Sequence, residues 1–142
     1  MTVLLDDHLL RDWMVGPDPA LSRAVGQHRL ATTNLWYARL CKSAARAAGG
    51  ALFGDWDAAQ RDAIVSSLIA LPDDIDLVPM RQLAWRMGVL GSQHSGLSTL
   101  GSEAVAAAEA LDATVVVSGR DDSPGMHRCC DALGIAYKTV DR

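Results

Sequence analysis

The sequence of 142 residues has no apolar run that approaches the length of about 18 residues needed for a membrane span. Its short N-terminal apolar stretch is not preceded by the basic segment of a secretory signal peptide. These absences predict a cytoplasmic protein that does not engage a membrane.

The sequence also lacks a cysteine framework and a large charge of one sign. Its three cysteines match no zinc-binding spacing, and an odd number gives no disulfide framework. Because Cys129 and Cys130 are neighbours in a predicted helix, their side chains diverge, so we interpret the cysteines as reduced packing residues. The formal net charge of −4 gives no overall attraction to nucleic acid, although thirteen Lys and Arg residues could gather on one face.

What is present is an ordinary globular composition, with 49% hydrophobic and 21% charged residues. The length suits one domain, residues 1–142, that buries its own core. Four short apolar segments are predicted as strands, at 2–5, 74–78, 113–119 and 135–140. Helical patterns lie between them, so we expect a three-layer α/β/α sandwich with a four-stranded parallel sheet.

The longest predicted helix covers 30–48 and ends at Gly49-Gly50. Ser98 is a plausible N-cap for the helix over 99–111. The tryptophans are expected to be core residues, since aromatic residues within amphipathic helices usually pack inward. The four histidines show no i, i+4 pair of the kind that zinc hydrolases use.

Acidic residues follow two of the predicted strands. Asp6 and Asp7 come after the first strand, and the segment 118–122 follows the third. In parallel α/β sheets, ligands collect beyond the carboxyl ends of the strands, so these two places would face one crevice. Two interpretations of Asp6 remain open, because a carboxylate here can serve a metal site or simply begin a helix.

This order of elements resembles the PIN domain, the fold of VapC-type toxins of toxin–antitoxin pairs and of other Mg-dependent ribonucleases. The resemblance is carried by "VLLDD" at the N-terminus, a helical pair, a helix opened by "LS" and the strand "ATVVVSGRD". It covers essentially the whole chain. It implies a metal-dependent endoribonuclease with an RNA substrate, an antitoxin-like protein partner and a tendency to form homodimers.

PIN domains hold metal with acids at four places. Asp6 matches the first place, whereas Asn34, Gly101 and Gly119 stand at the second, third and fourth. Glu103 lies two residues beyond the third place, about 200° around a helix, which points it away.

The surviving acids define the candidate site. Asp121 and Asp122 lie slightly beyond the fourth place, and with Asp7 and Glu103 they could form a displaced acidic cluster. The candidate catalytic residues are Asp6, Glu103 and Asp121, and the candidate metal ligands are Asp6, Asn34 and Asp122. Because Mg²⁺ prefers several anionic oxygens, we expect weak binding of Mg²⁺ or Mn²⁺.

Two functions follow from this pattern. The first is a divergent or catalytically impaired Mg-dependent ribonuclease homologue related to VapC-type toxins. The second is a non-catalytic RNA- or protein-binding module that uses the same crevice. A basic stripe formed by Arg39, Lys42 and Arg46 could contact RNA phosphates or only keep the helix soluble. Residue chemistry favours the binding module, while the usual activity of the family favours the ribonuclease.

Overall fold

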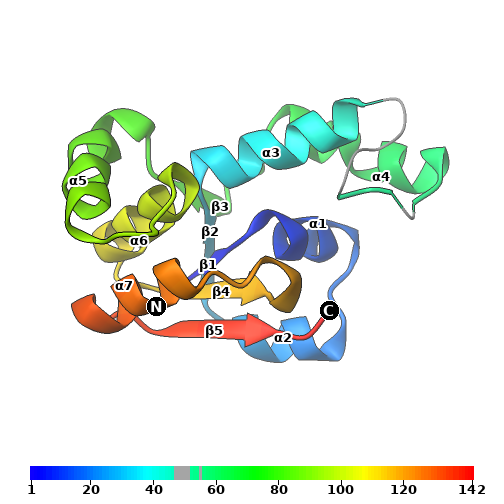
Figure 1. Cartoon of the computed structure of the whole chain (residues 1–142). Coiled ribbons are helices and arrows are strands. Elements are labelled where there is room, and N and C mark those ends of the chain that lie inside the picture. Colours follow the sequence, from blue (N-terminus) through cyan, green and yellow to red (C-terminus); the bar gives the residue numbers. More distant parts are fainter. Residues whose placement is uncertain (47–51, 55) are drawn as a thin grey trace.

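The computed structural model describes residues 1–46, 52–54 and 56–142, and shows a parallel sheet with helices on both faces (Figure 1). The elements are β1 (Thr2–Leu5), α1 (Asp7–Val15), α2 (Pro19–Val25), β2 (Arg29–Thr32), α3 (Asn34–Ala45), α4 (Ala58–Ile69), β3 (Ile75–Leu77), α5 (Met80–Gln93), α6 (Thr99–Leu111), β4 (Ala113–Ser118), the short 3-10 turn η1 (Gly119–Asp121), α7 (Pro124–Leu133) and β5 (Tyr137–Val140). The predicted helix end at Gly49-Gly50 lies outside the described residues. No helix in the described ranges is long and apolar enough to cross a bilayer.

The predicted α/β sandwich with a parallel sheet is confirmed, but the strand number was wrong. The sheet has five strands in the order β3-β2-β1-β4-β5, and all its pairings are parallel. The missed strand is β2, which lies in the segment that we predicted as the beginning of the longest helix. Its Leu30 and Ala31 are buried between β1 and β3, and this tertiary pairing outweighs the local helical pattern. Thr33 then caps α3 by accepting a hydrogen bond from the backbone N–H of Trp36.

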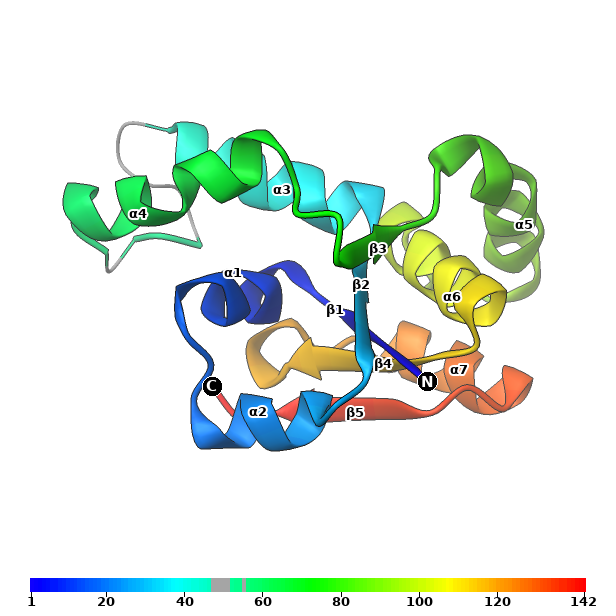
Figure 2. The same ribbon diagram turned by 180° about the vertical axis from the view of Figure 1, so that it is seen from behind.

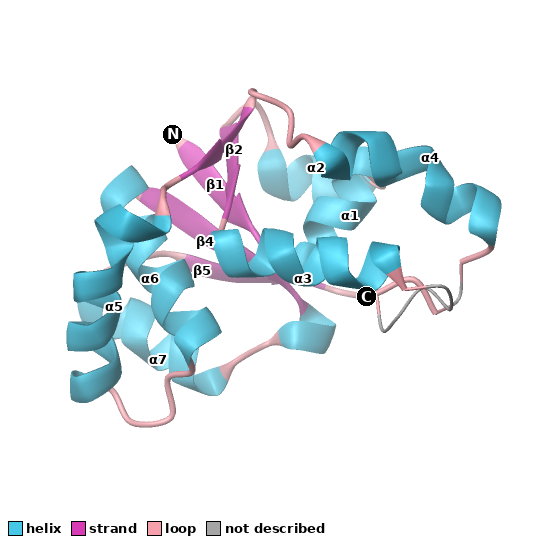
Figure 3. Cartoon of the chain, turned by 90° about the horizontal axis from the view of Figure 1, so that it is seen from above, coloured by secondary structure: helices cyan, strands magenta, loops and turns pink. Residues whose placement is uncertain are grey.

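The central strand β1 separates two hydrophobic cores. Val3 and Leu5 face a core that includes residues of α1, α2 and α4, whereas Leu4 faces a core that includes residues of α5, α6 and α7. Figure 3 shows these two groups of helices on opposite sides of the sheet. The alternation within three consecutive residues is what a strand buried on both faces requires.

Helix α3 joins the two halves of the molecule. It contributes Trp36 to one core and Leu40 to the other. In both views it passes over α1, which follows the carboxyl end of β1 (Figures 1 and 2). Side chains on the lower face of α3 can therefore reach the acids that follow β1.

Candidate functional site

Asp6 lies at the junction of β1 and α1 and is fully buried. One carboxylate oxygen accepts a hydrogen bond from the N–H of Leu9, at 2.9 Å, and so caps α1. The other accepts from the N–H of Ser118, at 2.8 Å, and so ties β1 to the end of β4. Burial raises the pKa of Asp6 to about 7, against the opposing effect of these two hydrogen bonds. Asp6 is thus a buried helix cap whose carboxylate also lies close to Asp7, His8 and Asp121.

Asp7 is also buried, and it is paired with a cation. Its carboxylate accepts hydrogen bonds from Arg39 and, at 2.9 Å, from the N–H of His8. The His8 imidazole lies 3.2 Å from the same carboxylate. Burial alone would raise the pKa of Asp7, but hydrogen bonds from His8 and Arg39 outweigh burial and hold the pKa below its ordinary value.

Arg39 brings a positive charge from α3 into this acidic region. Its guanidinium donates to Asp7 and to Asp121, which lies in the η1 turn after β4. The hydrogen bond to Asp7 is the main reason why the pKa of Arg39 is raised. The side chain is 40% exposed, so its outer side remains open to solvent. The long helix, for which the PIN resemblance implies a carboxylate at Asn34, therefore supplies a cation to this region from Arg39.

Within the described residues, one cluster could hold a metal ion, and it consists of Asp6, Asp7, His8 and Asp121. One potential ligand atom from each of these residues lies within 4.8 Å of the others. The oxygens of Asp6 already accept backbone N–H groups, however, and Arg39 occupies Asp7 and Asp121. A divalent ion could therefore bind these four residues only if it displaced the Arg39 guanidinium. With Arg39 in place, the cluster does not fit a metal.

Glu103 and Asn34 form a separate structural unit. The carboxylate of Glu103 is buried and accepts from the N–H groups of Asn34 and Leu35, at 2.9 and 2.8 Å, and from the Asn34 amide at 2.6 Å. It thereby satisfies the free N–H groups at the beginning of α3. The Asn34 amide also donates to the carbonyl of Val78 at 2.8 Å. Neither side chain belongs to the acidic cluster, and Glu103 points away as its helical position predicts.

The structure places the remaining candidate residues in different surroundings. Asp121 lies in the acidic cluster with Asp6, whereas Asp122 instead accepts a hydrogen bond from the hydroxyl of Tyr137 at 2.8 Å. Gly101 lies in the first turn of α6, where Ser98 caps the helix as predicted. The catalytic roles of Asp6, Glu103 and Asp121 remain predictions, as does metal binding by Asp6, Asn34 and Asp122.

Two residues of this region are absent from the predicted site: His8, which belongs to the cluster, and Arg39, which contacts it. His8 was dismissed because it has no histidine partner at helical spacing, yet its partners are the acids around it. Arg39 was placed on a surface stripe, because its contacts depend on how α3 crosses α1. The only sequence signal for Arg39 was its place, five residues after Asn34, in the helix that should have supplied an acid.

The titration of Asp6 gives a testable pH dependence. The ordinary pKa of an aspartate is 3.8, whereas that of Asp6 in the folded protein is about 7, so the folded state retains a proton that the unfolded chain loses. The contribution of Asp6 to stability should therefore be largest below pH 4 and should fall as the pH rises toward 7. Between pH 4.5 and 6, Asp6 alone should lower the free energy of unfolding by up to about 2 kcal/mol.

Urea denaturation of the wild type and Asp6→Asn at these two pH values isolates this effect. The low pKa of Asp7 places its own titration below this range. Over this pH range, the free energy of unfolding of Asp6→Asn should fall much less than that of the wild type, because the amide does not ionise. An equal decline in both proteins would contradict a protonated, buried Asp6.

Comparisons with known proteins support the fold. No protein-family model matches the chain, and no curated protein matches it. Among solved structures, the chain is similar to one chain in the structure of VapBC-1 from nontypeable Haemophilus influenzae, with a TM-score of 0.59 and 18% sequence identity over 98% of each chain. The chain thus has a parallel α/β fold that is PIN-like, with an acidic cluster at the carboxyl ends of its strands.

Proposed function

We propose that this chain is a VapC-like PIN-domain protein that binds RNA at the carboxyl ends of its strands without metal-dependent cleavage. The observation that carries the proposal is the guanidinium of Arg39, which lies on Asp7 and Asp121. Hydrolysis by Mg²⁺ needs carboxylates that are free to bind the ion. Here those carboxylates are already neutralised by a cation from the same chain.

The charges around the crevice support RNA as the ligand. Arg39 is partly exposed, Lys42 lies exposed on the same helix, and Arg120 lies exposed in the turn after β4. Arginine and lysine are the main partners of phosphate groups in nucleic-acid complexes. Because the net charge of the chain is −4, any attraction to RNA must come from local groups of cations such as this one.

A second candidate function is a Mg-dependent endoribonuclease of low activity. It is favoured by the close approach of the ligand atoms of Asp6, Asp7, His8 and Asp121, all within 4.8 Å. In this case a bound metal would supply Lewis-acid stabilisation of the phosphate. It requires that Arg39 withdraw from the cluster, so the arrangement of the described side chains favours the first function.

We also propose an antitoxin-like protein partner, because the similar solved structure is a VapBC complex. An apolar groove of about 470 Å³ lies between α3 and α4 and is lined by residues that include Tyr37, Cys41 and Leu68. At its edge Ile69 is 79% exposed. A partner segment or a second copy of the chain could cover this groove. If a homodimer forms here, Ile69→Asp should lower the molar mass measured by light scattering.

The test of RNA binding uses a labelled single-stranded RNA. Fluorescence anisotropy should show equal binding in EDTA and in Mg²⁺, and denaturing gels should show intact RNA in both. Cleavage in Mg²⁺ that is lost in Asp6→Asn would support the ribonuclease instead. Absence of binding under both conditions would rule out RNA as the ligand.

A further inference from the structure

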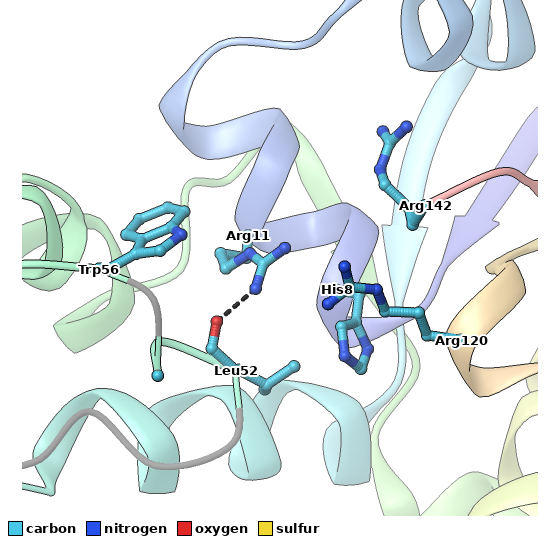
Figure 4. A pocket seen from close by; sticks show the side chains of 7 residues that line it. His8, Arg11, Leu52, Trp56, Arg120 and Arg142 are labelled. Atoms are coloured by element: carbon cyan, nitrogen blue, oxygen red, sulfur yellow. Dashed lines mark hydrogen bonds between the residues drawn. The ribbon is translucent and has the colours of Figure 1, made fainter.

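A small pocket with a basic lining lies beside the acidic cluster, at the same edge of the sheet. It has a volume of about 170 Å³, and Figure 4 shows its lining side chains. They come from α1, from the chain before α4, from the turn after β4 and from the chain after β5: His8, Arg11, Leu52, Gly54, Trp56, Arg120 and Arg142. Three of these seven residues are arginines, so the pocket concentrates positive charge in a chain that is acidic overall.

The size of the pocket limits what it can hold. Its volume corresponds to about six water molecules at liquid density. Sites for complete small-molecule ligands are larger, at roughly 300 Å³ or more. The pocket therefore fits one small polar group rather than a nucleobase with its sugar.

The charges of the three arginines are only partly compensated. Arg11 and Arg142 share the carboxylate of Asp12, at 2.8 and 2.9 Å, and Arg142 also pairs with Asp18 at 2.9 Å. Arg120 makes no side-chain hydrogen bond or ion pair with any described residue. Asp12 and Asp18 thus balance the charges of Arg11 and Arg142. The charge of Arg120 has no such carboxylate among the described residues.

Arg142, which contributes to the pocket wall, also has a buried donor without a partner in the described part of the chain. The Nη2 atom of Arg142 is buried without a hydrogen-bond partner among the described residues, and the whole side chain is only 14% exposed. A buried charged donor without an acceptor is costly, so the charge of Arg142 is not fully satisfied by the described residues.

Arg11 is held in position before any ligand arrives. Its guanidinium lies 5.2 Å from the centre of the Trp56 ring and donates to the carbonyl of Leu52 (Figure 4). Trp56 in turn packs edge-on against Phe53, with ring centres 5.0 Å apart. Such preorganisation lowers the entropy that is lost on binding.

We infer that this pocket binds one phosphate group. Guanidinium groups match the geometry of phosphate oxygens and bind them with paired hydrogen bonds. His8 lines the pocket and also lies 3.8 Å from Asp121, so the two sites share a wall. The phosphate belongs to an RNA strand that passes the acidic cluster. This source of the phosphate rests on the proposed function.

The test compares Arg120→Gln with Arg81→Gln. Arg120 has no described side-chain partner whose loss would disturb the fold, and Arg81 is an exposed arginine on α5, at the other end of the molecule (Figure 1). Inorganic phosphate is titrated while the indole N–H signal of Trp56 is followed by NMR and assigned with Trp56→Phe. Binding of labelled RNA is measured at several salt concentrations.

We expect phosphate to shift the Trp56 signal and to compete with RNA. Arg120→Gln should weaken both ligands on the order of tenfold. It should also reduce the slope of log affinity against log salt by about 0.7, as expected for one lost phosphate contact on a single strand. Arg81→Gln should behave as the wild type.

The outcomes separate this pocket from the proposed function. If phosphate shifts the Trp56 signal but RNA does not bind, the pocket stands with a free phosphate or a small phosphorylated molecule as its ligand, and RNA binding fails. If RNA binds equally to both variants and phosphate causes no shift, the pocket assignment is overturned while RNA binding stands.

Discussion

Replacement of Arg39 by methionine should lower the free energy of unfolding by about 3 kcal/mol in chelator and should create a response to Mn²⁺. Methionine keeps an unbranched stem but removes the charge that neutralises the buried Asp7. The loss of one partner from a buried ion pair costs about 3–5 kcal/mol, and the 40% exposure of Arg39 places this pair at the low end. Mn²⁺ should then stabilise the variant by binding the folded state alone.

Thermal and urea denaturation with EDTA or Mn²⁺ measure both effects. Lys42→Met is the matched control, because Lys42 is exposed on the same helix and lies outside the cluster. It should change neither stability nor metal response by much. An Arg39→Met protein as stable as the wild type in EDTA would show that Arg39 does not neutralise Asp7.

Removal of the Glu103 carboxylate should cost about 3 kcal/mol or more without any change in metal response. Glu103→Ala would leave the N–H groups of Asn34 and Leu35 and the Asn34 amide without their buried acceptor. Each buried polar group without a partner costs about 1–3 kcal/mol. We therefore expect Glu103→Ala to cause the large loss of stability that is typical of a residue with a structural role.

Glu109→Ala supplies the comparison within the same helix. Glu109 pairs with Arg86 at the surface, where its side chain is 40% exposed. Such surface pairs contribute about 0–1 kcal/mol. Equal losses in the two variants would contradict the assignment of Glu103 to the α3 terminus. Loss of RNA binding by Glu103→Ala protein that remains folded would instead indicate a direct role in the crevice.

The sequence predicts the fold well where a strand is apolar on both faces. Thr2–Leu5 and Ala113–Ser118 are such strands, and both pair in the centre of the sheet. Arg29–Thr32 was missed because its residues also suit a helix, and only its two neighbouring strands decide its conformation. Local pattern therefore predicted the class of the fold but not the full number of strands.

The candidate site was predictable only in part. A strand that ends in Asp6 and a loop that contains Asp121 could be assigned to one crevice by the rule for parallel sheets. The second acid of the PIN pattern was placed at Asn34, but Asn34 and Glu103 join each other at the beginning of α3. Arg39 reaches the cluster only because α3 crosses α1. The local sequence pattern does not predict how these two helices cross.

Calorimetric titration of Mn²⁺ into the wild type and Arg39→Glu tests most directly whether Arg39 takes the place of a metal. Glu at this position would remove the cation and add a carboxylate to Asp6, Asp7 and Asp121. We predict saturable one-site binding to the variant, and no saturable heat from the wild type over the same concentration range. Saturable binding to the wild type that is abolished by Asp6→Asn would contradict the account.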